Sequence, residues 1–200
     1  MIGADAAAGS RRVGPGRWIL FWTIALGGMA FDLSTKSIIF ERIGEPPSAP
    51  HSLVPNVLEL HTNYNSGALW GMGRSMPHSS LFFAGLSILA AFGIVYWLFI
   101  HKAEADWRMT TALALIMAGA LGNCYDRLML GHVRDFVHFH VDPINFDCAI
   151  FNFADNMLVL GAVILMILAL RPEFAQSHHR DVQAHPEEST PMSSETVSIP

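Results

Sequence analysis

Long uncharged stretches alternate with polar segments along this chain. Residues 18–31, 79–100 and 109–125 contain no Asp, Glu, Lys or Arg, and residues 151–170 contain only Asp155. A helix needs about 20 mostly apolar residues to cross a bilayer. The second and fourth runs reach that length, and the first and third reach it if their polar ends lie in the interface or in a protein-lined cavity. The pattern therefore predicts a membrane protein with four transmembrane helices.

The segments between these runs include two stretches that are typical of β-strands. Residues 57–64 (VLELHTNY) and 132–139 (HVRDFVHF) alternate in part and contain many β-formers. Residues 66–76 (SGALWGMGRSM) are rich in Gly and Met, which suits a mobile interfacial flap. Residues 171–200 are polar and lack periodicity, so we expect them to be disordered.

The composition agrees with a membrane protein and argues against a nucleic-acid binder. Hydrophobic residues make up 52% of the 200 residues and charged residues only 14%, whereas an ordinary soluble domain is about a quarter charged. The formal net charge of −5 offers no basic surface to a nucleic acid. The two cysteines, Cys124 and Cys148, lack the CxxC spacing of a zinc or redox motif and do not indicate a compartment.

Basic residues favour one orientation in the membrane. With the N-terminus in the cytoplasm, the other side receives five of the 12 basic residues and the cytoplasmic side receives Arg11, Arg12, Arg17, Lys102, Arg108, Arg171 and Arg180. The positive-inside rule then places both termini in the cytoplasm. The first run is not interpreted as a secretory signal peptide, because no small-residue cleavage site follows it.

Charged residues beside the apolar runs require an explanation, because a charge at mid-bilayer costs about 2.5–3.5 kcal/mol. Asp32 and Lys36 are spaced i, i+4, and we interpret them as an ion pair that anchors the outer end of the first span. Asp126 and Arg127 are adjacent, so we expect them to point toward different partners. The simplest interpretation of this second pair is again an anchor at the membrane interface.

Asp135 and Asp155 are the strongest candidates for chemistry. Asp135 interrupts an apolar strand-like stretch, and Asp155 lies near the start of the fourth run. If the third and fourth spans are antiparallel, both carboxylates reach the same outer edge of the membrane. Such a pair shares one proton, so one Asp can activate water while the other protonates the substrate. Spacing alone also fits a proton-coupled carrier, although no internal repeat is visible, or a non-catalytic interaction protein.

Histidines and cysteines offer two other chemistries. His138 and His140, at i and i+2 on a strand-like segment near His132, could present two metal ligands on one face. Exposed loop histidines are the default interpretation, and we expect no metal. Cys124 or Cys148 could act as a nucleophile with a histidine, but nothing in the sequence places a base beside either thiol.

Five motifs in order resemble those of the bacterial lipoprotein signal peptidases (signal peptidase II). The resemblance covers about residues 17–170, including all four apolar runs. Each motif alone is weak, but their combination on a four-span frame is specific. The motifs are DLSTK (32–36), NSGA (65–68), GNCYDR (122–127), VRDF (133–136) and FNFAD (151–155).

The resemblance implies an intramembrane aspartic endopeptidase that removes signal peptides from prolipoproteins just before a diacylglyceryl-modified cysteine. It makes Asp135 and Asp155 the catalytic dyad, which activates water without a metal or cofactor. The implied substrate-binding residues are Asn65, Gly67, Asn123, Arg127 and Asn152. The implied structural residues are Asp32, Lys36 and Asp126.

The expected fold is an all-α membrane protein with four transmembrane helices and a small extracytoplasmic β-rich cradle and flap. Residues 1–16 would be a cytoplasmic segment, residues 17–170 the membrane peptidase domain, and residues 171–200 a disordered cytoplasmic tail. The resemblance places the protein in the bacterial inner membrane with its active site at the outer face. Its expected partners are lipid-modified prolipoproteins and membrane lipids, and we expect a monomer.

Overall fold

The computed structural model describes residues 14–67, 73, 75–100 and 107–170. Contacts divide the chain into two units, Met1–Leu165 and Met166–Pro200, and of the second unit only the residues up to Leu170 are described. Three expected segments lie wholly or partly outside the described residues. They are most of the N-terminal segment, residues 68–72 and 74 of the flap, and the whole tail.

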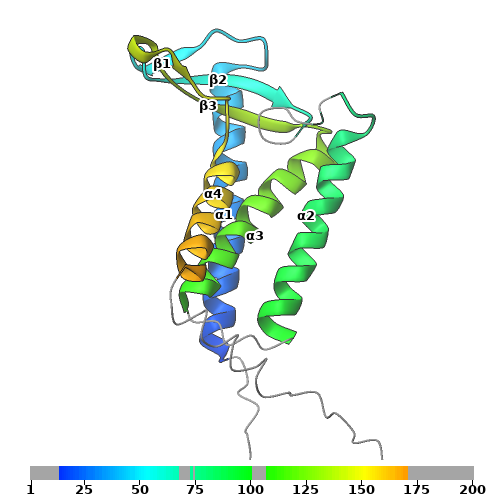
Figure 1. The fold of residues 1–200 in the computed structure, drawn as a ribbon. Helices are drawn as coiled ribbons and strands as arrows, with labels where there is room; N and C mark the ends of the chain where they lie inside the picture. Colours follow the sequence, from blue (N-terminus) through cyan, green and yellow to red (C-terminus); the bar gives the residue numbers. More distant parts are fainter. Residues whose placement is uncertain (1–13, 68–72, 74, 101–106, 171–200) are drawn as a thin grey trace, which may run out of the picture. The chain divides into compact units, whose positions relative to one another are not determined.

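Four helices form where the apolar runs predict them (Figure 1). Pro15 occupies the first turn of α1, where its missing N–H costs no hydrogen bond. Gly44, at a φ of 100°, follows the end of α1. The helices are α1 (Pro15–Ile43), α2 (Ser79–Val95, continued by a π-helical segment, Tyr96–Ile100), α3 (Trp107–Met129) and α4 (Phe153–Ala169).

The helices pack closely through small residues. α1 and α2 both pack against α3. A Cβ on Gly28 of α1 would lie 2.7 Å from the sulfur of Met157 in α4, and a Cβ on Gly119 of α3 would collide with the carbonyl oxygen of Ala154. These glycines let the start of α4 approach both α1 and α3, as small residues do in packed membrane helices.

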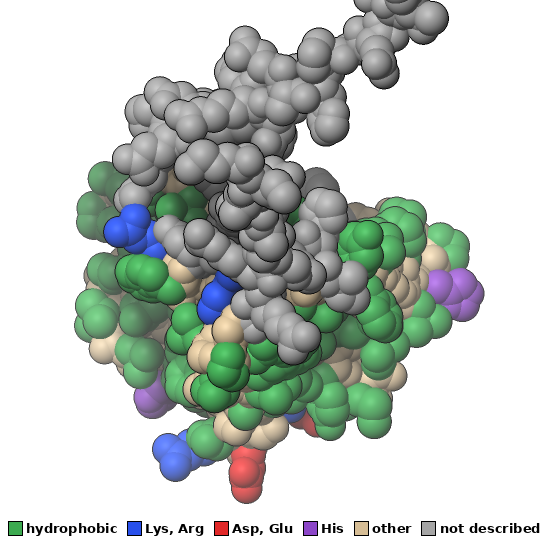
Figure 2. Space-filling model, turned by 90° about the horizontal axis from the view of Figure 1, so that it is seen from below, with side chains coloured by type: hydrophobic (Ala, Val, Ile, Leu, Met, Phe, Trp, Pro, Cys, Tyr) green, Lys and Arg blue, Asp and Glu red, His purple; other side chains and the backbone are tan. Residues whose placement is uncertain are grey.

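Apolar side chains cover the outside of the helices. On α2 the buried residues are Ser79, Ser80 and Ala84, whereas its exposed large apolar residues include Leu81, Phe82, Leu86, Leu89 and Phe92. Figure 2, viewed from the end of the helices away from the sheet, shows hydrophobic side chains over most of the described surface. A soluble monomer rarely exposes so much continuous apolar surface.

Two of the described helices are long and apolar enough to cross a membrane. They are Pro15–Ile43 and Ser79–Phe99, and Phe153–Ala169 is a shorter apolar helix. The first span is longer than its uncharged run because α1 continues through Asp32 and Lys36, which are both buried.

A four-stranded antiparallel sheet lies across one end of α1, α2 and α3 (Figure 1). Its central strands, β2 and β3, lie where the alternating stretches predict them. Asn63 of β2 pairs with Asp135 of β3, so the sheet joins segments about 70 residues apart. The strands, in spatial order, are β1 (His51–Val54), β2 (Leu58–Asn65), β3 (Val133–Val141) and β4 (Phe146–Asp147).

Candidate active site

The first turn of α4 fixes the carboxylate of Asp155. The Asn152 Oδ1 accepts a hydrogen bond from the backbone N–H of Asp155 at 3.0 Å, and the Asp155 Oδ2 accepts one from the backbone N–H of Asn152 at 3.1 Å. This reciprocal pair is a capping box, in which two side chains satisfy N–H groups that the helix start leaves open. The helix dipole also favours a negative charge at this position.

The same asparagine holds Asp135, which is only 1% exposed in β3. The Asn152 Nδ2 donates to the Asp135 Oδ1 at 2.6 Å, and the Asn65 Nδ2 donates to the Asp135 Oδ2 at 3.1 Å. Asn152 therefore donates to both carboxylates, to Asp135 through its side-chain Nδ2 and to Asp155 through its backbone N–H.

Asp135 carries a shifted pKa. Burial, followed by the negative charge of Asp155, raises the pKa of Asp135 to about 7, and the hydrogen bonds from Asn152 and Asn65 offset only part of that rise. A carboxyl group with this pKa holds a proton in about half of the molecules at neutral pH. This pair of carboxylates can therefore carry a single proton under physiological conditions.

A second asparagine holds Asp155 from α3. The Asn123 Nδ2 donates to the Asp155 Oδ1 at 2.8 Å, while the Asn123 Oδ1 accepts a hydrogen bond from Lys36 Nζ at 2.9 Å. Because the ammonium group binds the amide oxygen, the amide N–H must point toward Asp155. Lys36 therefore orients the group that binds the carboxylate.

Lys36 belongs to a buried ionic network. Its Nζ lies 2.7 Å from Asp32 Oδ2 and 3.4 Å from Asp126 Oδ2, and Asp126 Oδ1 lies 2.8 Å from Arg134 Nη2. Asp32 also accepts the backbone N–H of Ala154 at 2.8 Å, which ties α1 to the start of α4. The predicted ion pair of Asp32 and Lys36 is confirmed. The side chain of Asp126 is fully buried between two cations.

Arg127 has partners of its own, as its adjacency to Asp126 predicts. Its Nη2 donates to the carbonyl oxygen of Gly67 at 3.1 Å, and its guanidinium lies 5.6 Å from the centre of the Phe83 ring. The backbone N–H of Gly67 donates to Asn65 Oδ1 at 3.0 Å. Arg127 thus supports the asparagine that binds Asp135. Its own Nε is buried and has no hydrogen-bond partner among the described residues.

Apolar space adjoins the carboxylate of Asp155. A pocket of about 350 Å³ is lined by Asp155 together with Phe139, Cys148, Ala149, Ile150, Phe151, Asn156 and Val159. A second apolar pocket, of about 420 Å³, shares Phe151 and Asn156 with the first and extends toward α1 and β2. Asp155 therefore faces a space that suits hydrocarbon as well as a peptide.

The histidines differ from the default interpretation. His138 and His140 lie within β3 rather than in a loop, with 19% of each side chain exposed, and both interact with Glu59 of β2. His132 lies apart from them, with its ring 3.9 Å from that of Tyr64. Glu59 was not predicted, because its partner on the neighbouring strand follows from the β2–β3 register and not from its own sequence context.

The two thiols lie in different surroundings. Cys124 is buried, and its Sγ contacts the carbonyl oxygen of Ala84 at 3.7 Å. Cys148 lines the pocket beside Asp155, and in the described part of the chain neither cysteine forms a disulfide.

Comparisons with known proteins agree with the motifs. Residues 24–171 match the family described as "Signal peptidase (SPase) II". The chain is 34% identical over 162 residues to the lipoprotein signal peptidases of Staphylococcus aureus strains bovine RF122 / ET3-1 and JH9, covering 80% of this chain and 93% of each relative.

Two solved bacterial membrane enzymes share the fold. One is 26% identical with a TM-score of 0.64, covering 90% of this chain and 97% of the other. The second is 28% identical with a TM-score of 0.65, covering 81% and 97%. The family match spans most of the chain and contains every residue of the site described above. This membrane protein therefore belongs to the signal peptidase II family of proteases.

Proposed function

We propose that this protein removes the signal peptide of diacylglyceryl-modified prolipoproteins, cutting just before the lipidated cysteine, with Asp135 and Asp155 as an aspartic dyad. The observation that carries the proposal is that Asn152 donates a hydrogen bond to each carboxylate, from its side-chain amide to Asp135 and from its backbone N–H to Asp155. The raised pKa of Asp135 supports it, since a water-activating dyad needs one proton between two carboxylates.

In the proposed reaction, the ionised carboxylate takes a proton from a water molecule whose oxygen attacks the scissile carbonyl carbon. The protonated carboxyl group donates its proton to the carbonyl oxygen. When the C–N bond breaks, the leaving amine receives a proton from the carboxyl group that the water protonated. As the carbonyl group re-forms, the carboxylate that had protonated its oxygen takes that proton back from the hydroxyl of the tetrahedral intermediate, so the dyad returns to its single-proton state. No metal or cofactor takes part.

Charge balance supports the single shared proton. The buried group contains one more carboxylate than cations, so one proton makes it neutral, and an uncompensated buried charge would be costly. The cations are Lys36, Arg127 and Arg134, and the carboxylates are Asp32, Asp126, Asp135 and Asp155.

The polar residues around the dyad have two proposed roles. Asn65, Gly67, Asn123, Arg127 and Asn152 bind the unwound substrate backbone or position the dyad. Asparagine amides both donate and accept, as a peptide backbone in an apolar site requires, and the unpartnered Nε of Arg127 can bind a substrate carbonyl. Asp32, Lys36 and Asp126 are structural, because their ion pairs and the Asp32–Ala154 hydrogen bond join α1, α3 and α4.

We place residues 17–170 in the bacterial inner membrane as a domain of four transmembrane helices, with the sheet and the dyad at the outer face. Residues 1–16 and 171–200 are then cytoplasmic. α3 has 23 residues and reaches about 34 Å at 1.5 Å per residue, which suffices for a crossing. One chain supplies every proposed site residue, which supports a monomer.

Lipid modification gives the substrate a second point of recognition. The pocket beside Asp155 is largely apolar and has room for part of an acyl chain. Each buried CH₂ contributes about 0.8 kcal/mol, so a few methylenes distinguish a modified precursor strongly from an unmodified one.

The test is incubation of the purified protein with the same prolipoprotein in modified and unmodified form, with the products identified by mass spectrometry. We expect cleavage only of the modified form, with the lipidated cysteine at the new N-terminus. Equal cleavage of both forms would contradict the lipid requirement. Cleavage of neither form, by protein that is folded, would contradict the proposed activity.

A further inference from the structure

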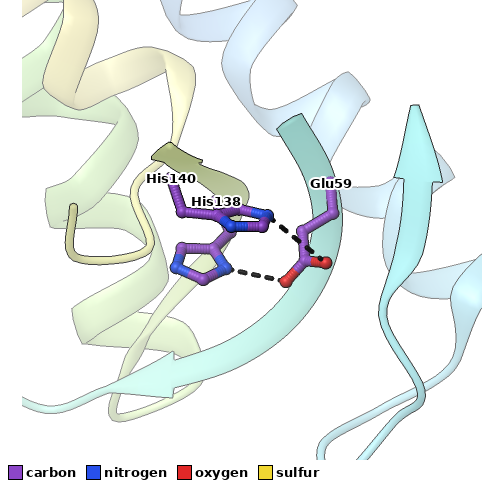
Figure 3. A group of neighbouring side chains, drawn as sticks. All are labelled: Glu59, His138 and His140. Carbon is purple, nitrogen blue, oxygen red and sulfur yellow. Dashed lines mark hydrogen bonds and ion pairs between the residues drawn. The ribbon is translucent and has the colours of Figure 1, made fainter. Parts of the chain in front are cut away.

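We propose that the sheet carries a second site, a divalent transition-metal site formed by Glu59, His138 and His140, with Asp147 orienting His138. Figure 3 shows the two imidazole rings side by side with the Glu59 carboxylate facing them. The proposal is independent of the proteolytic reaction, since none of these four residues belongs to the dyad or its supports.

The register of the sheet brings the three ligands together. Glu59 of β2 lies opposite His138 of β3. His140 is two residues further along β3, and side chains at i and i+2 of a strand lie on the same face. The two imidazole rings stack with centroids 5.0 Å apart and planes 18° apart. All three ligands therefore project from paired strands, which hold them more firmly than loops would.

The distances suit an ion of the size of zinc. His138 Nδ1 lies 2.7 Å from Glu59 Oε1, His140 Nε2 lies 3.8 Å from Glu59 Oε2, and the three donor atoms lie within 4.8 Å of one another. A tetrahedral ion with bonds of about 2.0–2.1 Å holds its ligand atoms about 3.3–3.4 Å apart. Side-chain rotations that move these atoms by about 1 Å are enough to form the site.

Asp147 supplies the outer support that metal-binding histidines require. Its Oδ1 lies 2.7 Å from His138 Nε2, on the opposite side of the ring from Glu59. A ligating histidine almost always donates its other N–H to a carboxylate, a backbone carbonyl or water, which fixes the tautomer and the ring orientation. His138 already has this arrangement, with Nδ1 toward the site and Nε2 toward Asp147.

The donor set and the adjoining space indicate the class of ion. Two imidazoles and one carboxylate suit Zn²⁺ and similar transition metals, whereas Mg²⁺ and Ca²⁺ prefer oxygen ligands alone. A cavity of about 260 Å³, lined by His138, His140, Asn145, Phe146 and Asp147, leaves room for a water molecule as the fourth ligand.

The position of the site indicates a structural role. His138 follows Asp135 by three residues on β3, which is about 10 Å along a strand. A bound ion would join β2 to β3 and stiffen the strand that carries Asp135 without contacting the dyad. The effect would be on the stability of the sheet.

The test uses the full chain, purified without a polyhistidine tag and treated with a chelator. Zn²⁺ is added in competition with a chromogenic zinc chelator, and Co²⁺ binding is followed by visible absorption. We expect one Zn²⁺ per chain and the intense Co²⁺ absorption of a tetrahedral site. Asp147→Asn should weaken binding by about 10- to 100-fold, and Glu59→Gln and His140→Gln should each weaken it further.

Two controls separate this site from four other histidines of the chain. His51→Gln removes a histidine of β1 outside the cluster, and a triple variant replaces His178, His179 and His185 by Gln. Both should bind Zn²⁺ as the unmodified chain does. Thermal unfolding without metal confirms that each variant folds. Absence of stoichiometric binding, or binding that persists in Glu59→Gln and disappears in the triple variant, would overturn the proposal.

Discussion

The protein holds two pairs of carboxylates in opposite ways. Asp32 and Asp126 lie against cations, with Lys36 Nζ 2.7 and 3.4 Å from their oxygens. Asp135 and Asp155 receive hydrogen bonds from asparagine amides instead. The first pair forms an ionic network, and the second pair is bound by neutral groups.

The difference shows that the position of a carboxylate and its protonation state can be controlled by different neighbours. A cation in contact with a carboxylate favours its ionised form strongly, whereas a neutral amide orients the group with a smaller effect on its protonation. The ionic network can therefore stabilise the helix bundle while the amide-bound pair remains able to exchange a proton. Lys36 connects the two groups, since its ammonium group donates to Asn123, whose amide in turn donates to Asp155.

The largest expected effect comes from replacing either carboxylate of the pair held by asparagines, Asp135 and Asp155, with an amide. Asp135→Asn and Asp155→Asn should each lower the rate of prolipoprotein cleavage by about 10³-fold or more, because general acid–base catalysis contributes about 10²–10⁴-fold and each Asp serves in both directions. The measurement is cleavage of a lipid-modified precursor by purified variants, with apparent Tm as the check on folding.

Glu41→Gln is the matched control, since it makes the same chemical change at an exposed position of α1. It should cleave at the normal rate. Near-normal cleavage by either dyad variant would contradict the assignment of Asp135 and Asp155.

Lys36→Met tests the ionic group and should act first on stability. The change leaves the fully buried Asp32 without its cation and removes one of the two cations beside Asp126. Breaking such a buried pair costs about 3–5 kcal/mol. We expect a large fall in apparent Tm in detergent, unlike the dyad variants. Adding Asp32→Asn should recover part of the loss, because Asp126 keeps Arg134. No recovery in the double variant would contradict the ion-pair explanation.

A smaller effect is the pH dependence of stability, which should arise from Asp135 in the pair held by asparagines. In the unfolded chain Asp135 loses its proton near its ordinary pKa of 3.8, whereas in the folded protein burial and Asp155 raise that pKa to about 7. Between these values the folded state binds more protons, so the free energy of unfolding falls as pH rises. Apparent Tm should therefore drop from about pH 4 to about pH 7, and the drop should be smaller in Asp135→Asn. Parallel curves would contradict a raised pKa at this residue.

Patterns that repeat along the chain predicted the fold well. Four apolar runs became α1 to α4, and the two alternating stretches became β2 and β3. The length of α1 was underestimated, because Asp32 and Lys36 look like a helix end in sequence but are neutralised by each other inside the bundle. Burial of charge depends on partners from other helices, which periodicity does not report.

The site was predicted less completely than the fold. The motifs singled out Asn65, Asn123 and Asn152, but the sequence does not reveal that Asn152 caps α4 and binds Asp135 at once. That arrangement depends on how the chain returns alongside β3 before α4 begins, where Phe151 pairs with Val137. Glu59 was missed for a related reason, since its approach to His138 requires the register of two strands distant in sequence.

The smallest expected effect is that of the C-terminal extension. Residues 175–200 lie beyond the family match, which ends at residue 171 and contains every residue named above in the ionic network and the pair of carboxylates held by asparagines. Deleting them should leave the cleavage rate within about twofold and the apparent Tm unchanged, because terminal polar segments outside a packed core tolerate removal. The measurement is the same cleavage assay in detergent, with the full chain beside the truncated one. A large loss of activity at unchanged Tm would show that the tail takes part in substrate handling, and the two groups of carboxylates would no longer suffice to explain the rate.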